Sequence, residues 1–399
     1  MLMNGPRAAA LMDASGLDGL IGTRLENVFY LSGVWNVSQT LFPHDTQCYA
    51  VTARGRLDRP VVVISTGDWD QTLTASATPV DTVHYGTFFR ENPGQSKLTT
   101  AESRLQAQTI ERAPRTDALD GLVGALQELG LAEGRVGLDE TVFKAGYREE
   151  LKRRLPRLEV IGAAGLLREI RMIKTPEEVR RLRRSAGVTE RAIASAAGMA
   201  RPGVTEREMA AEFRRSVVSQ GGLPTFTLLR FGRNAPLGQV PSDDTRLEPG
   251  DLIWLDVGSL VDGYWSDLAR VFVLGEPPRK LRTYYDAALA GEDLALDIAR
   301  PGLPVRELFE RVVACVRSSG IPHYRRHHLG HGIGVEVYDP PLISPGDEHV
   351  VEAGMVLNVE TPYYELGWGG VHVEDPFLVG ELHNELLTTL GRGLGVIEV

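Results

Sequence analysis

Two aspartates in neighbouring apolar segments are the residues of this chain whose type and spacing most directly suggest chemistry. Asp256 lies within the run 252–258 and Asp267 within the run 266–272, so the two are 11 residues apart. The Asp262-Gly263 pair between the runs favours a tight hairpin. Because side chains alternate along a strand, a two-residue turn at 261–262 or at 262–263 puts both carboxylates on one face of the hairpin.

Two carboxylates on one buried face repel each other, and their burial is costly unless a cation neutralises them. A pair of metal ions would neutralise both. The alternative is that one aspartate is solvated on its strand and the other caps a turn. The hairpin alone does not decide between these two interpretations.

Three more isolated polar residues occur further along the chain, in apolar or glycine-rich segments. His331 lies in the glycine-rich segment 330–334, Glu360 directly follows the apolar run 355–359, and Glu374 follows the segment 370–373. A single buried histidine or strand-end carboxylate is usually an ordinary structural residue. Together with the two aspartates, however, these residues form an oxygen-rich set with one nitrogen, which suits two divalent ions such as Mn²⁺, Co²⁺ or Zn²⁺.

The elements that must position these residues begin with a region in which strand-like and helical segments alternate. Strands are predicted at 17–22, 49–52, 61–64, 136–139 and 160–161, with helices at 7–14 and 116–129. This alternation predicts an α/β domain with a mixed sheet, and no Gly-x-Gly-x-x-Gly loop follows any of its strands. A boundary is expected at 165–175, where Thr175, Pro176 and Glu178 form a capping-box pattern that predicts a helix over 177–199.

An internal repeat organises the rest of the chain. The segment 200–208 matches the segment 299–307 in a shared Ala-Arg-Pro-Gly and a shared Arg-Glu, at an offset of 99 residues. Each copy is predicted to be a helix, a turn, a second helix, a glycine stop and then strands. This pattern predicts two similar halves that share a central site, and chance similarity of two helical hairpins is the alternative.

The five polar residues and their spacing resemble the pita-bread metallopeptidases, in the branch of Xaa-Pro dipeptidases (prolidases) and aminopeptidase P. The family's ligand order is Asp, Asp, His, Glu, Glu, with 11 residues between the aspartates, 29 from His to the first Glu and 14 to the second. The matching residues here are Asp256, Asp267, His331, Glu360 and Glu374. The resemblance covers the whole chain and implies an α/β (α+β) fold, with a creatinase-type N-terminal domain at 1–165 and a duplicated pita-bread catalytic domain at 175–399.

The resemblance also implies a function. A dinuclear metal-dependent exopeptidase would hydrolyse Xaa-Pro dipeptides, with a metal-activated water attacking the scissile carbonyl and with Asp267 and Glu374 bridging the two ions. Glu360 would orient the water and accept its proton. His327 would bind substrate and Tyr364 would lie near the scissile bond, although ordinary packing is the alternative for both. Aminopeptidase P-like cleavage of longer Xaa-Pro peptides and a non-catalytic peptide-binding pseudoenzyme are the alternative functions.

At four positions the chain departs from the family pattern. Gln239 and Tyr338 stand where the family usually has histidines, Ala269 where it usually has threonine, and His372 where it usually has arginine. None of these positions holds a metal ligand in the family. Gln239, Tyr338 and His372 are the expected substrate-binding residues, so their identities predict an atypical substrate pocket.

Composition excludes several other classes of protein. The 399 residues carry a net charge of −10 without a long basic run, which argues against a nucleic-acid partner. Cys48 and Cys315 are far apart, which argues against disulfide scaffolding and thiolate zinc sites. No segment has the length of a membrane span and no signal peptide is recognisable, so we expect a cytoplasmic protein. The resemblance implies a homodimer, and Trp35 either reaches the partner or packs in the core.

Overall fold

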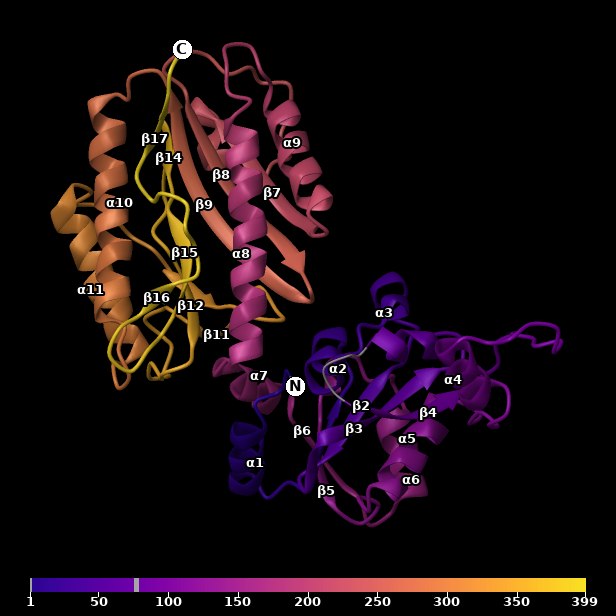
Figure 1. Cartoon of the computed structure of the whole chain (residues 1–399). Coiled ribbons are helices and arrows are strands. Elements are labelled where there is room, and N and C mark those ends of the chain that lie inside the picture. Colours follow the sequence, from indigo (N-terminus) through magenta and orange to yellow (C-terminus); the bar gives the residue numbers. More distant parts are fainter. Residues whose placement is uncertain (1, 75–78) are drawn as a thin grey trace. The chain divides into compact units, whose positions relative to one another are not determined.

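The computed structural model describes residues 2–74 and 79–399. The chain divides into two compact units, Met1–Arg171 and Met172–Val399 (Figure 1). None of the described helices combines the length and the apolar character that are needed to cross a lipid bilayer.

The described residues of the N-terminal unit form a six-stranded sheet in the order β4-β3-β2-β1-β5-β6. The strands are β1 (Gly19–Gly22), β2 (Tyr49–Ala53), β3 (Arg56–Ser65), β4 (Asp81–Tyr85), β5 (Arg135–Leu138) and β6 (Glu159–Gly162). Strand β2 is antiparallel to β1 and β3, whereas the pairs β1–β5, β3–β4 and β5–β6 are parallel. The mixed sheet that the sequence predicts is therefore confirmed.

Helices and two 3₁₀ turns complete this unit. They are α1 (Gly5–Ala14), α2 (Leu25–Ser32), α3 (Val37–Leu41), η1 (Trp69–Thr74), α4 (Thr100–Thr109), α5 (Ala118–Glu128), η2 (Glu140–Val142), α6 (Tyr147–Arg154) and α7 (Ala164–Met172). Leu122 and Leu126 of α5 pack with Val63 and Val83 of the sheet in one apolar core. Trp35 is half-buried and its ring lies edge-on against Phe29 at 5.4 Å between centroids.

The unit Met172–Val399 is organised around a nine-stranded sheet, whose main path is β11-β10-β12-β15-β9-β8-β7. Its strands are β7 (Leu223–Phe231), β8 (Leu252–Val261), β9 (Tyr264–Leu274), β10 (Gly330–Gly332), β11 (Asp339–Leu342), β12 (Val356–Glu360), β15 (Glu374–Leu378), β16 (Glu385–Leu386) and β17 (Gly395–Ile397). Strands β13 (Tyr363–Glu365) and β14 (Gly369–Val371) form a separate pair, and η3 (Gly232–Leu237) follows β7. This is the pita-bread arrangement that the resemblance implies.

Four helices pack on one face of this sheet: α8 (Pro176–Ala197), α9 (Glu206–Ser219), α10 (Arg279–Ile298) and α11 (Val305–Ser319) (Figure 1). Leu255 and Leu268 belong to the apolar core beneath α8 and α9, and Val359 belongs to the core beneath α10 and α11. Because strand side chains alternate between faces, the neighbouring Asp256 and Asp267 lie on the face away from the helices.

The start of α8 has the predicted cap. The hydroxyl of Thr175 accepts a hydrogen bond from the amide of Glu178 at 3.3 Å, and the Glu178 carboxylate accepts one from the amide of Thr175 at 2.8 Å. Pro176 occupies the first helical turn, where its missing N–H costs nothing. The capping box is therefore confirmed.

Equivalent hydrogen bonds confirm the internal repeat. The amide of Gly203 donates to the carbonyl of Leu247 at 2.8 Å, and the amide of Gly302 donates to that of Val351 at 3.0 Å. Gly203 and Gly302 have nearly equal positive φ angles, 89° and 94°. Since these glycines are separated by the offset of 99 residues read from the sequence, the two helical hairpins are built on the same local turn.

The β8–β9 hairpin adopts the second of the two predicted registers. Val261 pairs with Tyr264 and Asp256 with Ala269, so the loop consists of Asp262 and Gly263. These two residues have φ angles of 52° and 80°, as a type I′ turn requires. Asp267 lies two residues before Ala269, and both aspartates share one face as predicted.

Replacing Gly263 with alanine tests the importance of this turn. A Cβ atom in the left-handed region costs roughly 1–2 kcal/mol, so Gly263→Ala should lower the free energy of unfolding of this unit by about that amount in chemical denaturation. The matched control is Gly346→Ala, because a Cβ at Gly346 meets nothing within 4 Å and its φ is not positive. Equal effects of the two substitutions would contradict the assignment.

Candidate metal centre

Three strands place carboxylates in one row across the sheet, and a fourth strand, β9, lies between two of them. Asp256 of β8 pairs with Ala269 of β9, and Ala269 pairs with Glu374 of β15. Glu374 in turn pairs with Glu360 of β12. Ala269, the position where the family usually has threonine, thus contributes only a methyl group in the middle of the row. Asp267 lies on the same face of β9, two residues before Ala269.

Strand β10 brings His331 beside this row. His331 pairs with Asn358. The preceding residue must be glycine: Gly330 has a φ of 118°, and a Cβ atom there would lie 2.0 Å from the carbonyl oxygen of Asn358. The Nδ1 atom of His331 lies 2.9 Å from the Gly332 carbonyl. Because a carbonyl only accepts, Nδ1 carries the proton and Nε2 keeps a free lone pair, 3.6 Å from Asp267 Oδ2.

Atoms that could bind metal gather in two buried groups, and within each group they lie within 4.8 Å of one another. The first group is Asp267, His331 and Glu374, and the second is Glu360, His372 and Glu374. Glu374 is shared by both groups, and Asn358 Nδ2 donates to its Oε1 at 2.6 Å. Asp256 joins the second group through a distance of 3.9 Å between its Oδ2 and Nδ1 of His372.

The crowding of these carboxylates shifts their proton affinities. Burial, followed by the neighbouring charges of Asp267 and Glu360, raises the pKa of Asp256 well above its ordinary value. Burial and the Asp267 carboxylate likewise raise the pKa of Glu374. Burial would also raise the pKa of Glu360, but its contacts with His328 and His372 hold that pKa well below the usual range.

Several buried polar atoms of the site lack a hydrogen-bond partner among the described residues. They are Oδ1 of Asp267, Nε2 of His331 and both ring nitrogens of His372. Buried polar groups are normally paired, so unpaired ones require an explanation. Divalent cations supply one, because carboxylate oxygens and neutral imidazole nitrogens are their usual protein ligands. The donor set therefore fits divalent metal ions.

Two residues that the sequence analysis missed contact Glu360. His328 Nδ1 lies 3.0 Å from Oε1 of Glu360, and an Nη atom of Arg326 lies 3.4 Å from Oε2. The predicted His327 is exposed, and its ring meets the His328 ring at 4.3 Å between centroids. The only signal in the sequence was the adjacency of the two histidines, which does not show which one faces inward.

The other predicted site residues have different surroundings. The Tyr338 ring stacks on the His331 ring at 3.6 Å between centroids. The Tyr364 ring lies edge-on to the Trp254 ring at 5.8 Å and to the His372 ring at 6.4 Å. Gln239 is exposed in the segment that follows η3. Both tyrosines and His372 are thus at the carboxylate cluster, whereas the Gln239 side chain faces solvent.

A cavity of about 310 Å³ adjoins the site. Its lining residues are His323, Arg325, Arg326, Pro362, Tyr363 and Tyr364. The Tyr363 hydroxyl donates to Glu365 Oε2 at 3.0 Å and lies 2.7 Å from Nε2 of His323. Arg326 and Tyr364 connect this cavity to the carboxylate cluster, so a molecule in the cavity would contact the cluster.

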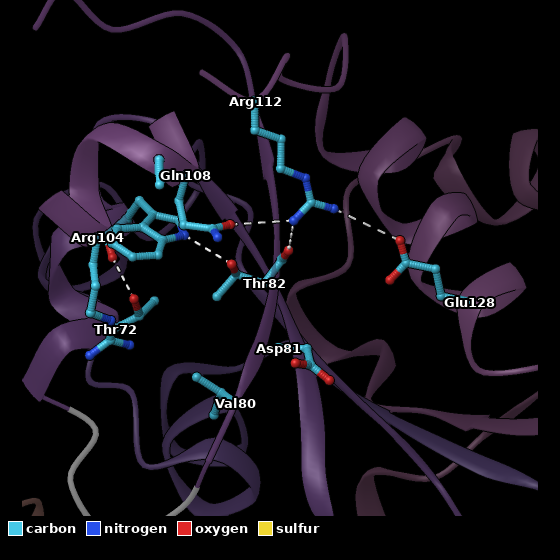
Figure 2. Close-up of a pocket in the computed structure, with 10 residues that line it drawn as sticks. Thr72, Val80, Asp81, Thr82, Arg104, Gln108, Arg112 and Glu128 are labelled. Atoms are coloured by element: carbon cyan, nitrogen blue, oxygen red, sulfur yellow. Dashed lines mark hydrogen bonds and ion pairs between the residues drawn. The ribbon is translucent and has the colours of Figure 1, made fainter. Parts of the chain in front are cut away.

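A second cavity, of about 330 Å³, lies in the N-terminal unit (Figure 2). Arg112 donates to the carbonyl of Thr82 at 3.1 Å and to Gln108 Oε1 at 3.4 Å, and it lies 3.9 Å from Glu128. Its guanidinium is therefore occupied by the protein's own groups. The described residues that line this cavity include no histidine or cysteine.

Comparisons with known proteins show which family the chain belongs to. Residues 180–381 match the model of metallopeptidase family M24, and residues 6–173 match the creatinase/prolidase N-terminal domain. A Xaa-Pro dipeptidase of Pyrococcus horikoshii is 30% identical over 287 residues, which cover 71% of this chain and 80% of that relative.

Solved structures share the fold over nearly the whole chain. The X-Pro aminopeptidase of Thermotoga maritima MSB8 has a TM-score of 0.76 at 22% identity, over 99% of both chains. The prolidase of Pyrococcus horikoshii OT3 has a TM-score of 0.72 at 24% identity, over 98% of this chain and 99% of that one. The chain therefore belongs to metallopeptidase family M24 and begins with a creatinase/prolidase N-terminal domain.

Proposed function

We propose that this protein is a dinuclear metal-dependent exopeptidase that hydrolyses Xaa-Pro dipeptides. Two divalent ions, Mn²⁺, Co²⁺ or Zn²⁺, would be held by Asp256, Asp267, His331, Glu360 and Glu374. The similarity to a Xaa-Pro dipeptidase at 30% identity supports the reaction class. We also propose residues 1–165 and 175–399 as the functional domains and a homodimer as the assembly, since the family resemblance implies both.

Divalent ions bound at this cluster would supply Lewis-acid polarisation of a peptide carbonyl and would acidify water. Glu360 is the proposed proton carrier, because the family resemblance gives this position that role and an ionised carboxylate can accept a proton from water. Glu360 would hold the attacking water, take its proton and pass that proton to the leaving nitrogen. A prolyl nitrogen in a peptide bond carries no hydrogen, so it leaves only after it has been protonated.

Tyr364 is suited to donate a hydrogen bond to the peptide carbonyl. Burial and the charges of Asp256 and Glu360 raise its pKa well above the ordinary value, so its hydroxyl keeps the proton near neutral pH. The side chain is 38% exposed and lines the cavity, where a substrate could reach it. His327 and Gln239 are exposed as well, and their proposed role is contact with the outer part of the substrate.

The cationic lining of the cavity is the observation that favours dipeptides. Arg325 and Arg326 line the cavity, and Arg326 contacts Glu360 at 3.4 Å. In a dipeptide the C-terminal carboxylate lies one residue from the scissile bond, so it would sit beside these side chains. Arginine binds carboxylates through paired N–H groups. In a longer peptide this position holds a neutral amide, which would gain less from the same contacts.

A substrate panel tests the proposed reaction. Metal-free protein supplied with Mn²⁺ or Co²⁺ should hydrolyse Ala-Pro and Met-Pro faster than Leu-Ala or a Xaa-Pro-Xaa tripeptide. Preferred turnover of the tripeptide would instead support the aminopeptidase P-like alternative. The absence of metal-dependent turnover of any of these peptides would contradict the enzyme and leave the peptide-binding pseudoenzyme.

Replacing Arg325 tests the proposed carboxylate contact. Arg325→Met should raise KM for Ala-Pro by roughly three- to tenfold and change KM for Ala-Pro amide little, because one partly solvated charge-assisted hydrogen bond is lost. Arg306→Met, at an exposed arginine of α11, is the matched control and should change neither value. Equal changes for the acid and the amide would contradict a contact with the carboxylate.

The pH dependence of stability tests the metal requirement. Free carboxyl groups titrate near pH 4, and the pKa values of Asp256 and Glu374 are raised in the folded protein. Above about pH 4 the metal-free folded state therefore binds more protons than the unfolded state, and its free energy of unfolding falls as pH rises. The lowered pKa of Glu360 acts in the opposite sense only below about pH 4, and the lowered pKa of His372 does so only below about pH 6.5.

Thermal denaturation of chelator-treated protein should therefore show a melting temperature that falls from roughly pH 5 to pH 8. Added Mn²⁺ should reduce this fall, because cations relieve the repulsion at the site. The part due to Glu178, whose pKa burial raises to about 7, should remain. The control variant Glu374→Gln should show a smaller fall without metal, since one raised carboxyl is gone. If the melting temperatures of the wild type and of Glu374→Gln fell equally with pH, the crowding of carboxylates would not be the cause of the fall.

A further inference from the structure

His372 lies among the carboxylates of the site. Its Nε2 is 3.4 Å from Oε2 of Glu360 and 3.4 Å from Oε2 of Glu374, and its Nδ1 is 3.9 Å from Oδ2 of Asp256. The side chain is 1% exposed. It lies between β14 and β15, two residues before Glu374.

Aromatic contacts hold the ring in this position. The Trp254 ring stacks on it at 5.8 Å between centroids with an interplanar angle of 19°, and the Tyr364 ring meets it edge-on. Trp254 is itself buried on β8, two residues before Asp256. The imidazole is therefore packed by the same strand that carries one of the proposed ligands, and it has little freedom to turn away.

The chemistry of the two nitrogens distinguishes His372 from the arginine that the family usually has there. A guanidinium has only N–H donors and stays charged, so it cannot bind a metal ion. A neutral imidazole offers a lone pair and is a common metal ligand. Neither nitrogen of His372 has a hydrogen-bond partner among the described residues, although three carboxylates surround the ring.

We propose that His372 is a sixth protein ligand of the metal centre, so that two imidazoles, those of His331 and His372, bind metal. This inference rests on the proposed dinuclear centre. A second nitrogen ligand makes the site more borderline in character, which favours Zn²⁺ or Co²⁺ over Mn²⁺ relative to a site with one imidazole. The competing role for His372 is that of a protonated counter-ion, as the family's arginine would be.

X-ray absorption spectroscopy of the zinc-loaded protein distinguishes these roles, because it counts imidazoles per zinc without reference to activity. With two bound zinc ions the inference predicts an average of one imidazole per zinc, and a counter-ion role predicts one half. The variant His372→Gln should lower the count to one half, and so should His331→Gln. The remote control His349→Gln, at a half-exposed histidine paired with Asp347, should leave it unchanged.

The outcomes separate the inference from the proposed function. If the wild type bound two zinc ions with an average of one half imidazole per zinc, the role of His372 would be overturned and the dinuclear centre would stand. No bound zinc would overturn the centre itself. If His372→Gln did not fold, the wild-type count alone would still decide between the two roles.

A metal competition assay adds an independent measurement. His372→Arg restores the residue that is usual in the family, so it should shift the ratio of Zn²⁺ to Mn²⁺ affinities toward Mn²⁺ by tenfold or more. An unchanged ratio in His372→Arg would show that position 372 does not bind metal.

Discussion

Repulsion among buried carboxylates is the constraint on which the rest of this structure depends. Asp256, Asp267, Glu360 and Glu374 lie on one face of the sheet, with Glu374 directly paired to Glu360. Like charges at this spacing cannot all remain ionised in a buried site without a neutralising cation. A fold that keeps them together must therefore hold the backbone rigidly and leave space for metal ions.

The rigidity comes from a second set of charges directly behind the site. The Arg270 guanidinium donates to the carbonyl oxygens of Ala269 and Glu374 at 2.9 Å and 3.1 Å, and to the Asp375 carboxylate at 2.7 Å. Arg392 lies 3.3 Å from the other oxygen of Asp375. The carboxylate of Asp375 is thus paired with arginines, whereas that of Glu374 is not. Asp375 is therefore a structural charge, whereas the neighbouring Glu374 carboxylate is available to a metal ion.

Regular elements were predictable from the sequence, and the conformation of irregular segments was not. The hairpin, the α8 cap and the repeated turn at Gly203 and Gly302 depend on local preferences that a few residues encode. The conformation of the loop before β10 decides which of His327 and His328 faces Glu360. A loop has neither the two-residue period of a strand nor the 3.6-residue period of a helix, so the sequence does not predict which side chain points inward. The position of His372 depends on Trp254, which is distant in sequence, so only the folded chain shows that its ring meets the carboxylates.

Anomalous diffraction from crystals soaked in Mn²⁺, recorded at the manganese absorption edge, tests most directly whether this face of the sheet binds metal. Two anomalous peaks should both contact the Glu374 carboxylate, one beside His331 and one beside Asp256. A map without peaks at Glu374, in crystals that bind Mn²⁺ elsewhere or not at all, would contradict metal binding at this face.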